Sequence, residues 1–139
     1  MRERDRVVVY CDGGARGNPG PAAIGAIVLD PSTEPPTELA TVSERIGVAT
    51  NNVAEYRALI AGLEAAREFP ARRISVRADS QLLVRQLEGK YRVKQPHLRP
   101  LYEQAREFLD EWEEVDLAHV PREDNIVADA LVNAALDGG

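Results

Sequence analysis

The chain contains few of the residues that mark secreted, membrane or zinc-binding proteins. Its single cysteine, Cys11, cannot form a disulfide within the chain, which favours a reducing cytoplasmic compartment. No segment approaches the roughly 18 consecutive apolar residues of a membrane span, and the charged N-terminus lacks the apolar core of a secretory signal. With two histidines and one cysteine, the sequence also lacks a zinc-ligand cluster. We therefore expect a cytoplasmic protein outside the membrane, with Cys11 as a small buried side chain.

Positive charge is also scarce in this sequence. The formal net charge is −6, and Lys90 and Lys94 are the only lysines among 17 basic residues. This balance argues against a surface that is basic throughout and binds nucleic acid by charge alone. The placement of the 23 acidic residues matters more, because cations bound to a cluster of them would offset part of the negative charge.

The 139 residues indicate one domain, with a core from about residue 7 to residue 136. Apolar or alternating segments predict strands at residues 7–11, 22–29, 40–45, 74–78 and 115–120. Helical spacing and capping residues predict helices at residues 51–68, 80–87, 98–112 and 126–136. This order predicts an α/β fold in which three antiparallel strands come first and helices pack on the faces of a mixed sheet.

Two acidic residues stand where predicted strands end. Asp12 follows the apolar run Val7–Cys11 and opens a segment rich in glycine, while Asp79 follows the strand at 74–78. A carboxylate at a strand end, beside glycines that let another backbone approach closely, is typical of a functional site. Each residue also has a simpler explanation. Asp12 could merely start a turn, and Asp79 together with Ser80 could cap the next helix.

Two more acidic residues, Glu55 and Asp129, lie on apolar faces of predicted helices. Their neighbours on those faces are Leu59, Gly62, Leu63 and Ala66 for Glu55, and Ile126, Val132 and Leu136 for Asp129. An acid in such a place costs several kcal/mol unless something compensates it. Glu55 could interact with the helix dipole, and Asp129 could pair with Arg122. Because four such acids occur together, we expect them to converge on divalent cations, and an all-oxygen ligand set favours Mg²⁺ or Mn²⁺.

Four motifs follow one another along almost the whole chain. They are Asp12-Gly13-Gly14 with Gly17–Pro21, Thr50–Glu55, Asp79–Gln81, and Asn125 with Asp129. Together they resemble the type 1 ribonuclease H family. The resemblance implies a ribonuclease H-like fold with a five-stranded mixed sheet, in which two parallel strands are added to the three antiparallel ones. It also implies an endonuclease that hydrolyses the RNA strand of RNA–DNA hybrids by two-metal-ion catalysis.

The resemblance assigns roles to individual residues. The four acids Asp12, Glu55, Asp79 and Asp129 match catalytic residues that bind two ions, Mg²⁺ or Mn²⁺. Three side chains match contacts to the minor groove of the hybrid: Asn18, Asn52 and Gln81. Thr50 matches a position that contacts a phosphate of the DNA strand. We also expect substrate contacts at four further motif and loop residues: Gly13, Asn51, Arg122 and Asn125.

The sequence departs from the family pattern in the segment Pro121–Asn125. Many relatives carry a histidine in the loop between the last strand and the last helix, where it assists proton transfer or product release. This loop has no histidine, and His119 lies one residue before it, in the predicted strand. We expect His119 to be structural, although Arg122 or Glu123 could take the place of the missing histidine.

A second departure lies between Gly89 and His97. Many relatives have a basic helix and loop there that binds substrate. This chain has only three cations around one aromatic residue: Lys90, Tyr91, Arg92 and Lys94. The segment could be a solvated connector, or its cations could bind phosphates of the DNA strand. The compact form is similar to type 1 enzymes without the basic insertion, including domains fused to other enzymes.

The expected partner is therefore an RNA–DNA hybrid, bound by a monomer with no obligatory protein partner and no membrane. Two alternatives remain open. A nuclease of the same fold could act on double-stranded RNA, and a protein of another class could bind the hybrid without cleaving it. The presence of all four acids argues against the second alternative.

Overall fold

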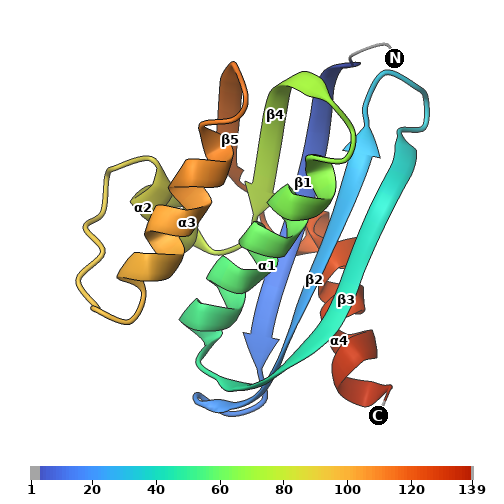
Figure 1. Cartoon of the computed structure of the whole chain (residues 1–139). Helices are drawn as coiled ribbons and strands as arrows, with labels where there is room; N and C mark the ends of the chain where they lie inside the picture. The colour runs from blue at the N-terminus through green and yellow to red at the C-terminus, as the bar shows by residue number, and fades with distance from the viewer. Residues whose placement is uncertain (1–3, 139) are drawn as a thin grey trace.

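Five strands form the central sheet of the computed structural model, which describes residues 4–138 (Figure 1). The strands are β1 (Arg4–Ala15), β2 (Gly20–Asp30), β3 (Thr37–Ala49), β4 (Ala71–Ala78) and β5 (Glu114–His119). Their order across the sheet is β3-β2-β1-β4-β5. The β1–β2 and β2–β3 pairs are antiparallel, whereas β4 and β5 are added in parallel. The expected mixed sheet is confirmed, and β1 is its central strand.

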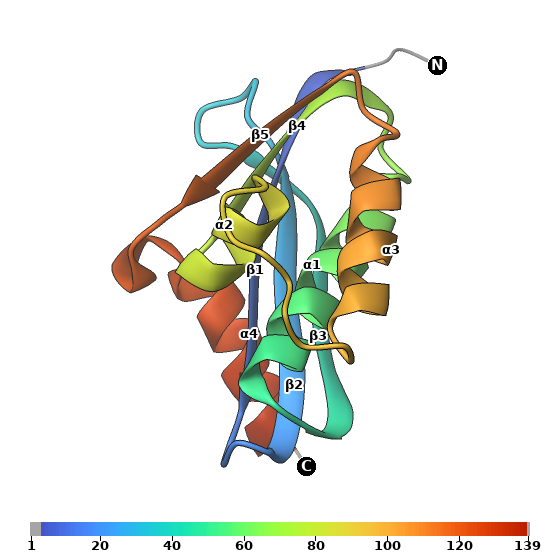
Figure 2. The same ribbon diagram turned by 90° about the vertical axis from the view of Figure 1, so that its left-hand side faces the viewer.

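Helices cover both faces of this sheet. They are α1 (Asn51–Ala66), α2 (Gln81–Leu87), α3 (Arg99–Leu109) and α4 (Ile126–Asp137), with a short 3-10 helix η1 (Arg122–Asp124) before α4. The edge-on view shows α1 and α3 on one face of the sheet and α4 on the other (Figure 2). Within residues 4–138, no helix is both long enough and apolar enough to cross a membrane.

Side-chain caps fix the starts of the two helices that follow strand ends near the acids. Oγ1 of Thr50 accepts from the N–H of Val53 at 3.3 Å, which confirms the predicted start of α1. Oγ of Ser80 accepts from the N–H of Leu83 at 3.2 Å and caps α2. Because Ser80 caps the start of α2, the carboxylate of Asp79 is not needed as its cap.

Alternation along β1 decides which side chains enter the main core. Val7, Val9 and Cys11 are buried beneath α1, as the apolar run predicts. The predicted apolar stripe of α3 also packs into this core, where Ala105 and Leu109 are buried. Each fully buried large apolar side chain contributes roughly 1.5–3 kcal/mol relative to exposure. This packed core holds the ends of β1, β4 and α1 in a fixed arrangement.

The prediction of which α4 residues are buried is wrong at Ile126. Ile126 is 65% exposed, although the sequence pattern places it on the apolar face of the helix. The helix rests on the sheet through Ala128 and Val132, which are buried, so Ile126 in its first turn faces away. Asp129 therefore lies at the margin of the buried face, with its side chain 32% exposed.

Candidate active site

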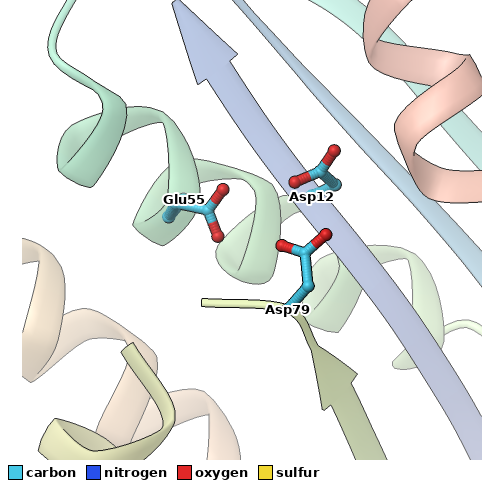
Figure 3. Close-up of side chains that lie close together, drawn as sticks. All are labelled: Asp12, Glu55 and Asp79. Atoms are coloured by element: carbon cyan, nitrogen blue, oxygen red, sulfur yellow. The ribbon is translucent and has the colours of Figure 1, made fainter. Parts of the chain in front are cut away.

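Three of the predicted acids come together at one edge of the sheet. Asp12 lies in the last part of β1, Glu55 lies in α1, and Asp79 follows β4 directly. Cys11 pairs with Ala78 in the parallel β1–β4 register, so the acids that follow these two residues lie side by side. Carboxylate oxygens of the three residues lie within 4.8 Å of one another, and the side chains point toward one another (Figure 3).

Gly13 allows Glu55 to reach this cluster. A side chain at Gly13 would overlap with the carbonyl group of Ala54 and approach the backbone nitrogen of Glu55, so only glycine lets α1 lie this close to β1. The N–H of Gly13 donates to Oε1 of Glu55 at 3.1 Å. The other carboxylate oxygen, Oε2, is buried and has no hydrogen-bond partner within residues 4–138. One oxygen of Glu55 is thus held in place while the other remains available to a ligand.

Burial and mutual repulsion make the cluster unfavourable when it is fully ionised. Burial, followed by the charge of Asp79, raises the pKa of Asp12 to about 7. Burial, followed by the charge of Asp12, raises the pKa of Glu55 well above its usual value. A bound cation would remove this repulsion and favour the ionised carboxylates.

The donor set fits a hard divalent cation. The three clustered ligands offer only carboxylate oxygens, and no histidine or cysteine belongs to the group among residues 4–138. Oxygen ligands of this kind suit Mg²⁺ and Mn²⁺ better than Zn²⁺. The unpartnered Oε2 of Glu55 is the strongest sign of an intended ligand, because a buried carboxylate oxygen without a partner is otherwise costly.

Asp129 approaches the same cluster from the other face of the sheet. It is not among the three acids within 4.8 Å, but it lines the same cavity of about 630 Å³ as Asp12, Glu55 and Asp79. Its hydrogen bond and charge add to the raised pKa of Asp12, after burial and Asp79. The alternative pairing is also present, with Nη2 of Arg122 at 3.8 Å from Oδ1 of Asp129. Because the Arg122 side chain is 81% exposed, this pair is weak and leaves Asp129 accessible.

Two predicted substrate residues form a link between the β1–β2 turn and the start of α1. Oδ1 of Asn18 accepts from the N–H of Asn51 at 3.1 Å. Oδ1 of Asn51 accepts in turn from the N–H of Ala15 at 2.9 Å. Asn51 also lines the cavity of the acids. These bonds fix both amide side chains near the cavity.

The structure corrects the prediction for Asn125. Its side chain is 1% exposed, and Nδ2 donates to the carbonyl oxygen of Cys11 at 2.9 Å. A side chain this deeply buried cannot touch a nucleic acid that docks on the surface, so the expected substrate contact is wrong. The N–H of Gly13 is likewise committed to Glu55 rather than free for a substrate.

The three basic side chains that were predicted to bind phosphates line a second concavity of about 420 Å³. Its walls include Lys90, Arg92, Lys94, the half-exposed Tyr91, and Asn52 at the start of α1. Asn52 neighbours Asn51, which lines the cavity of the acids, so both concavities border the first turn of α1. Gln81, the first residue of α2, is exposed.

His119 lies closer to the acids than its place in the sequence suggested. It is exposed at the end of β5, and its Nε2 lies 3.2 Å from the carbonyl oxygen of Asp79. It also lines the cavity of the acids. The parallel pairing of β5 with β4 explains this position, because Ala78 and His119 are partners in the register. The closeness of His119 to the acids could be predicted from the sequence only if the order of the strands in the sheet were known.

Comparisons with known proteins agree with this fold. A family model described as Reverse transcriptase-like matches residues 10–135. Ribonuclease HI of Halobacterium salinarum is 47% identical over 95% of this chain and 65% of its own length. The bifunctional protein Rv2228c of Mycobacterium tuberculosis is 46% identical over 95% of this chain. The chain spans only 36% of that relative's length.

Solved structures show the same relationship. The N-terminal RNase H domain of Rv2228c, solved as a fusion with maltose binding protein, superposes with a TM-score of 0.90 at 46% identity, covering 95% of this chain and 99% of that one. LC11-RNase H1 in complex with an RNA/DNA hybrid gives 0.86 at 42% identity, covering 95% and 97%. Fold and site thus define a nuclease-type α/β domain with a carboxylate centre. The chain belongs to the ribonuclease H family, in its type 1 form.

Proposed function

We propose that this protein hydrolyses the RNA strand of RNA–DNA hybrids with the help of two divalent cations, Mg²⁺ or Mn²⁺. The observation that carries the proposal is the convergence of Asp12, Glu55 and Asp79, with oxygens within 4.8 Å of one another, in a cavity that Asp129 also lines. The similarity to LC11-RNase H1, solved with a hybrid, supports the choice of substrate.

The chain's own residues prepare the site for this reaction. When bound, two cations would stabilise the negative charge on the attacking and leaving oxygens of the phosphodiester. Asp12, Glu55 and Asp79 hold these cations, and Gly13 keeps Glu55 oriented through its N–H. Asp129 supplies the fourth carboxylate from α4. The repulsion among these acids makes their affinity for cations high, because binding relieves it.

Recognition of the hybrid requires contacts to both strands but none to base sequence. Asn18, Asn52 and Gln81 face the minor groove, where amide groups can donate to and accept from the 2′-hydroxyl of RNA. Oγ1 of Thr50 accepts from Val53, which leaves its hydroxyl proton free to donate to a phosphate of the DNA strand. These contacts address groove shape and backbone, so cleavage is independent of sequence.

The cationic concavity extends the binding surface beyond the acids. Both concavities border the first turn of α1, one at Asn51 and the other at Asn52, so a duplex lying over that turn can contact both. Lys90, Arg92 and Lys94 then bind phosphates of the DNA strand, while Arg122 contacts the backbone near Asp129. These cations compensate locally for the net charge of −6.

The decisive experiment compares three labelled duplexes with and without Mg²⁺. Cleavage of the RNA strand in the hybrid alone, and only with Mg²⁺, is the expected result. Equal cleavage of double-stranded RNA would replace the proposal with the first alternative, and binding of the hybrid without cleavage would replace it with the second. We also propose that the protein is a cytoplasmic monomer with no obligatory partner. Sedimentation of the active protein would test its oligomeric state.

A further inference from the structure

The start of α4 is attached to the central strand in an unusual way. Asn125 stands at the N-cap position of α4 but makes no side-chain capping bond. Its Nδ2 donates instead to the carbonyl oxygen of Cys11, the residue before Asp12. Its Oδ1 is buried and has no hydrogen-bond partner among the described residues. Asparagine at this position normally caps its own helix, so the side chain here gives up a local bond for one to β1.

A glycine brings the next turn of α4 against the sheet. Gly25 pairs with Asp12 across the β1–β2 ladder. A side chain at Gly25 would overlap with the carbonyl oxygen of Ala128 and lie 3.0 Å from the backbone nitrogen of Val132. Ala128 precedes Asp129 in the chain. Because Gly25 has no side chain, α4 contacts β2 directly beside Asp12. The contact is made by Ala128, the residue before the fourth acid.

Each of the two contacts joins a neighbour of Asp12 to a part of α4 close to Asp129. Asn125 joins α4 to the residue before Asp12, and Gly25 joins the residue before Asp129 to the partner of Asp12. Neither residue is placed to touch a substrate, since Asn125 is buried and Gly25 has no side chain.

We propose that Asn125 and Gly25 are positioning residues that place Asp129 against Asp12, so that the fourth carboxylate reaches the cations. The inference rests on the proposed function for its kinetic consequences, but its consequence for metal binding can be measured without any substrate. Partners that orient metal ligands typically matter by about 10–100-fold in affinity or activity when they are replaced.

Two substitutions test the proposal. Asn125→Ser supplies a hydroxyl that can cap α4 but is too short to replace the bond to Cys11. Gly25→Ala inserts a methyl group against Ala128. We expect each variant to bind Mn²⁺, followed by electron paramagnetic resonance, about 10–100-fold more weakly than the parent. On the hybrid, kcat falls by a similar factor while KM stays within about twofold.

A second arm shows whether these residues act through Asp129. In an Asp129→Asn background, the same substitutions should change Mn²⁺ affinity by less than about twofold, because the group they position is gone. Equal effects in both backgrounds would overturn the proposal. So would parental Mn²⁺ affinity and kcat in the two variants. If Gly25→Ala does not fold, Asn125→Ser decides alone.

Two control variants separate positioning from lost stability. Gly14→Ala adds the same methyl group on β1, the strand paired with that of Gly25, but it meets only Cγ1 of Val132 at 3.7 Å, an ordinary contact. Leu109→Ala removes buried packing from α3, away from the acids. Both should keep parental Mn²⁺ affinity, and a loss of affinity in Leu109→Ala equal to that in Asn125→Ser would overturn the proposal. If the parent binds Mn²⁺ but cleaves no hybrid, the proposed function fails while the Mn²⁺ measurements still decide this inference.

Discussion

The backbone N–H of Gly13 donates to Oε1 of Glu55 at 3.1 Å and ties the central strand to the helix that covers it. The same contact holds a carboxylate whose second oxygen has no partner among residues 4–138, beside two further acids. The site is therefore rigidly built yet electrostatically unfavourable without cations. This conflict between packing and charge leads to predictions about stability as well as activity.

Replacing Asp12 by asparagine should abolish cleavage and leave the fold intact. In buffer with EDTA, we expect Asp12→Asn to melt at the same temperature as the parent or higher, because one neutral amide relieves the repulsion among the acids. Thermal melting followed by circular dichroism provides the measurement. A large drop in melting temperature would show that Asp12 is structural.

Added Mg²⁺ should raise the melting temperature of the parent, since the cation binds only the folded chain. The shift should grow with the logarithm of the Mg²⁺ concentration once the site is nearly saturated. Asp12→Asn has lost one ligand and should respond less at every concentration. Identical shifts in the two proteins would mean that Mg²⁺ binds elsewhere.

Stability in the absence of cations should depend on pH through Asp12. The pKa of Asp12 is about 7 in the folded protein, against about 3.9 for an unperturbed aspartate. The unfolded chain thus binds fewer protons between these values, and stability falls as pH rises from about 4 to about 7, on the order of a few kcal/mol. Above pH 7 the loss is complete.

Urea unfolding of cation-free protein across this pH range gives the measurement, with Asp12→Asn as the comparison. Asp30 and Asp116 have a lowered pKa through their hydrogen bonds and act in the opposite direction, so they stabilise the fold above about pH 4. Both residues are present in parent and variant. The difference between the two curves therefore reports the titration of Asp12 together with its effect on Glu55, whose pKa the charge of Asp12 raises. A difference that is constant with pH would contradict the prediction.

His119→Ala should change the melting temperature more than the turnover. The imidazole touches the backbone carbonyl of Asp79 rather than a carboxylate, so its loss loosens the end of β5 without removing a ligand. Single-turnover cleavage and thermal melting test this, with the exposed His97→Ala as the control. A roughly thousandfold fall in kcat with an unchanged melt, within the range of a lost acid–base group, would make His119 catalytic.

Removing the positive side chains of Lys90, Arg92 and Lys94 should weaken binding of the hybrid without changing which nucleic acid is preferred. Each lost phosphate contact lowers the salt slope of binding by about 0.7–0.9. With all three replaced by alanine, KM should rise steeply at moderate salt while kcat at saturation stays near the parental value. Hybrid cleavage measured against salt concentration provides the test.

A matched variant carries the same change in charge at the far end of β4. Arg67, Arg72 and Arg73 lie at the end of α1 and the start of β4, away from Asp79, and each pairs with an acid. Their triple replacement by alanine should leave the salt slope of KM unchanged. Equal salt curves for both triple variants would show that the segment from Lys90 to Lys94 is only a solvated connector.

Local pattern was enough to predict most of the fold. The apolar run before Asp12, the alternation in the strands and the capping Thr50 are signals that depend on nearby residues alone. The meeting of Asp12 and Asp79 follows from two neighbouring parallel strands that end at the same edge. Glu55 could be placed because its apolar neighbours on α1 had to face the sheet.

The predictions failed where the outcome depends on packing between distant segments. Asn125 was expected to contact the substrate, and nothing near it in the sequence shows that its amide turns to β1 instead. The exposure of Ile126 depends on how α4 packs on the sheet. That packing involves Gly25 of β2, a strand far away in the sequence, which lies against Ala128 of the helix. An isolated glycine within the apolar segment of β2 was a usable sign of such a close approach.

The position of α4 at the end of the described elements has a consequence for synthesis. The ribosome delivers β1 first, and the sheet can begin to pair long before Asn125 and Asp129 emerge. A nascent chain at that point has three of the acids but neither the fourth nor the helix that covers Gly25. If the protein acts as proposed, the carboxylate site is therefore complete only after α4 has been synthesised and has packed on the sheet.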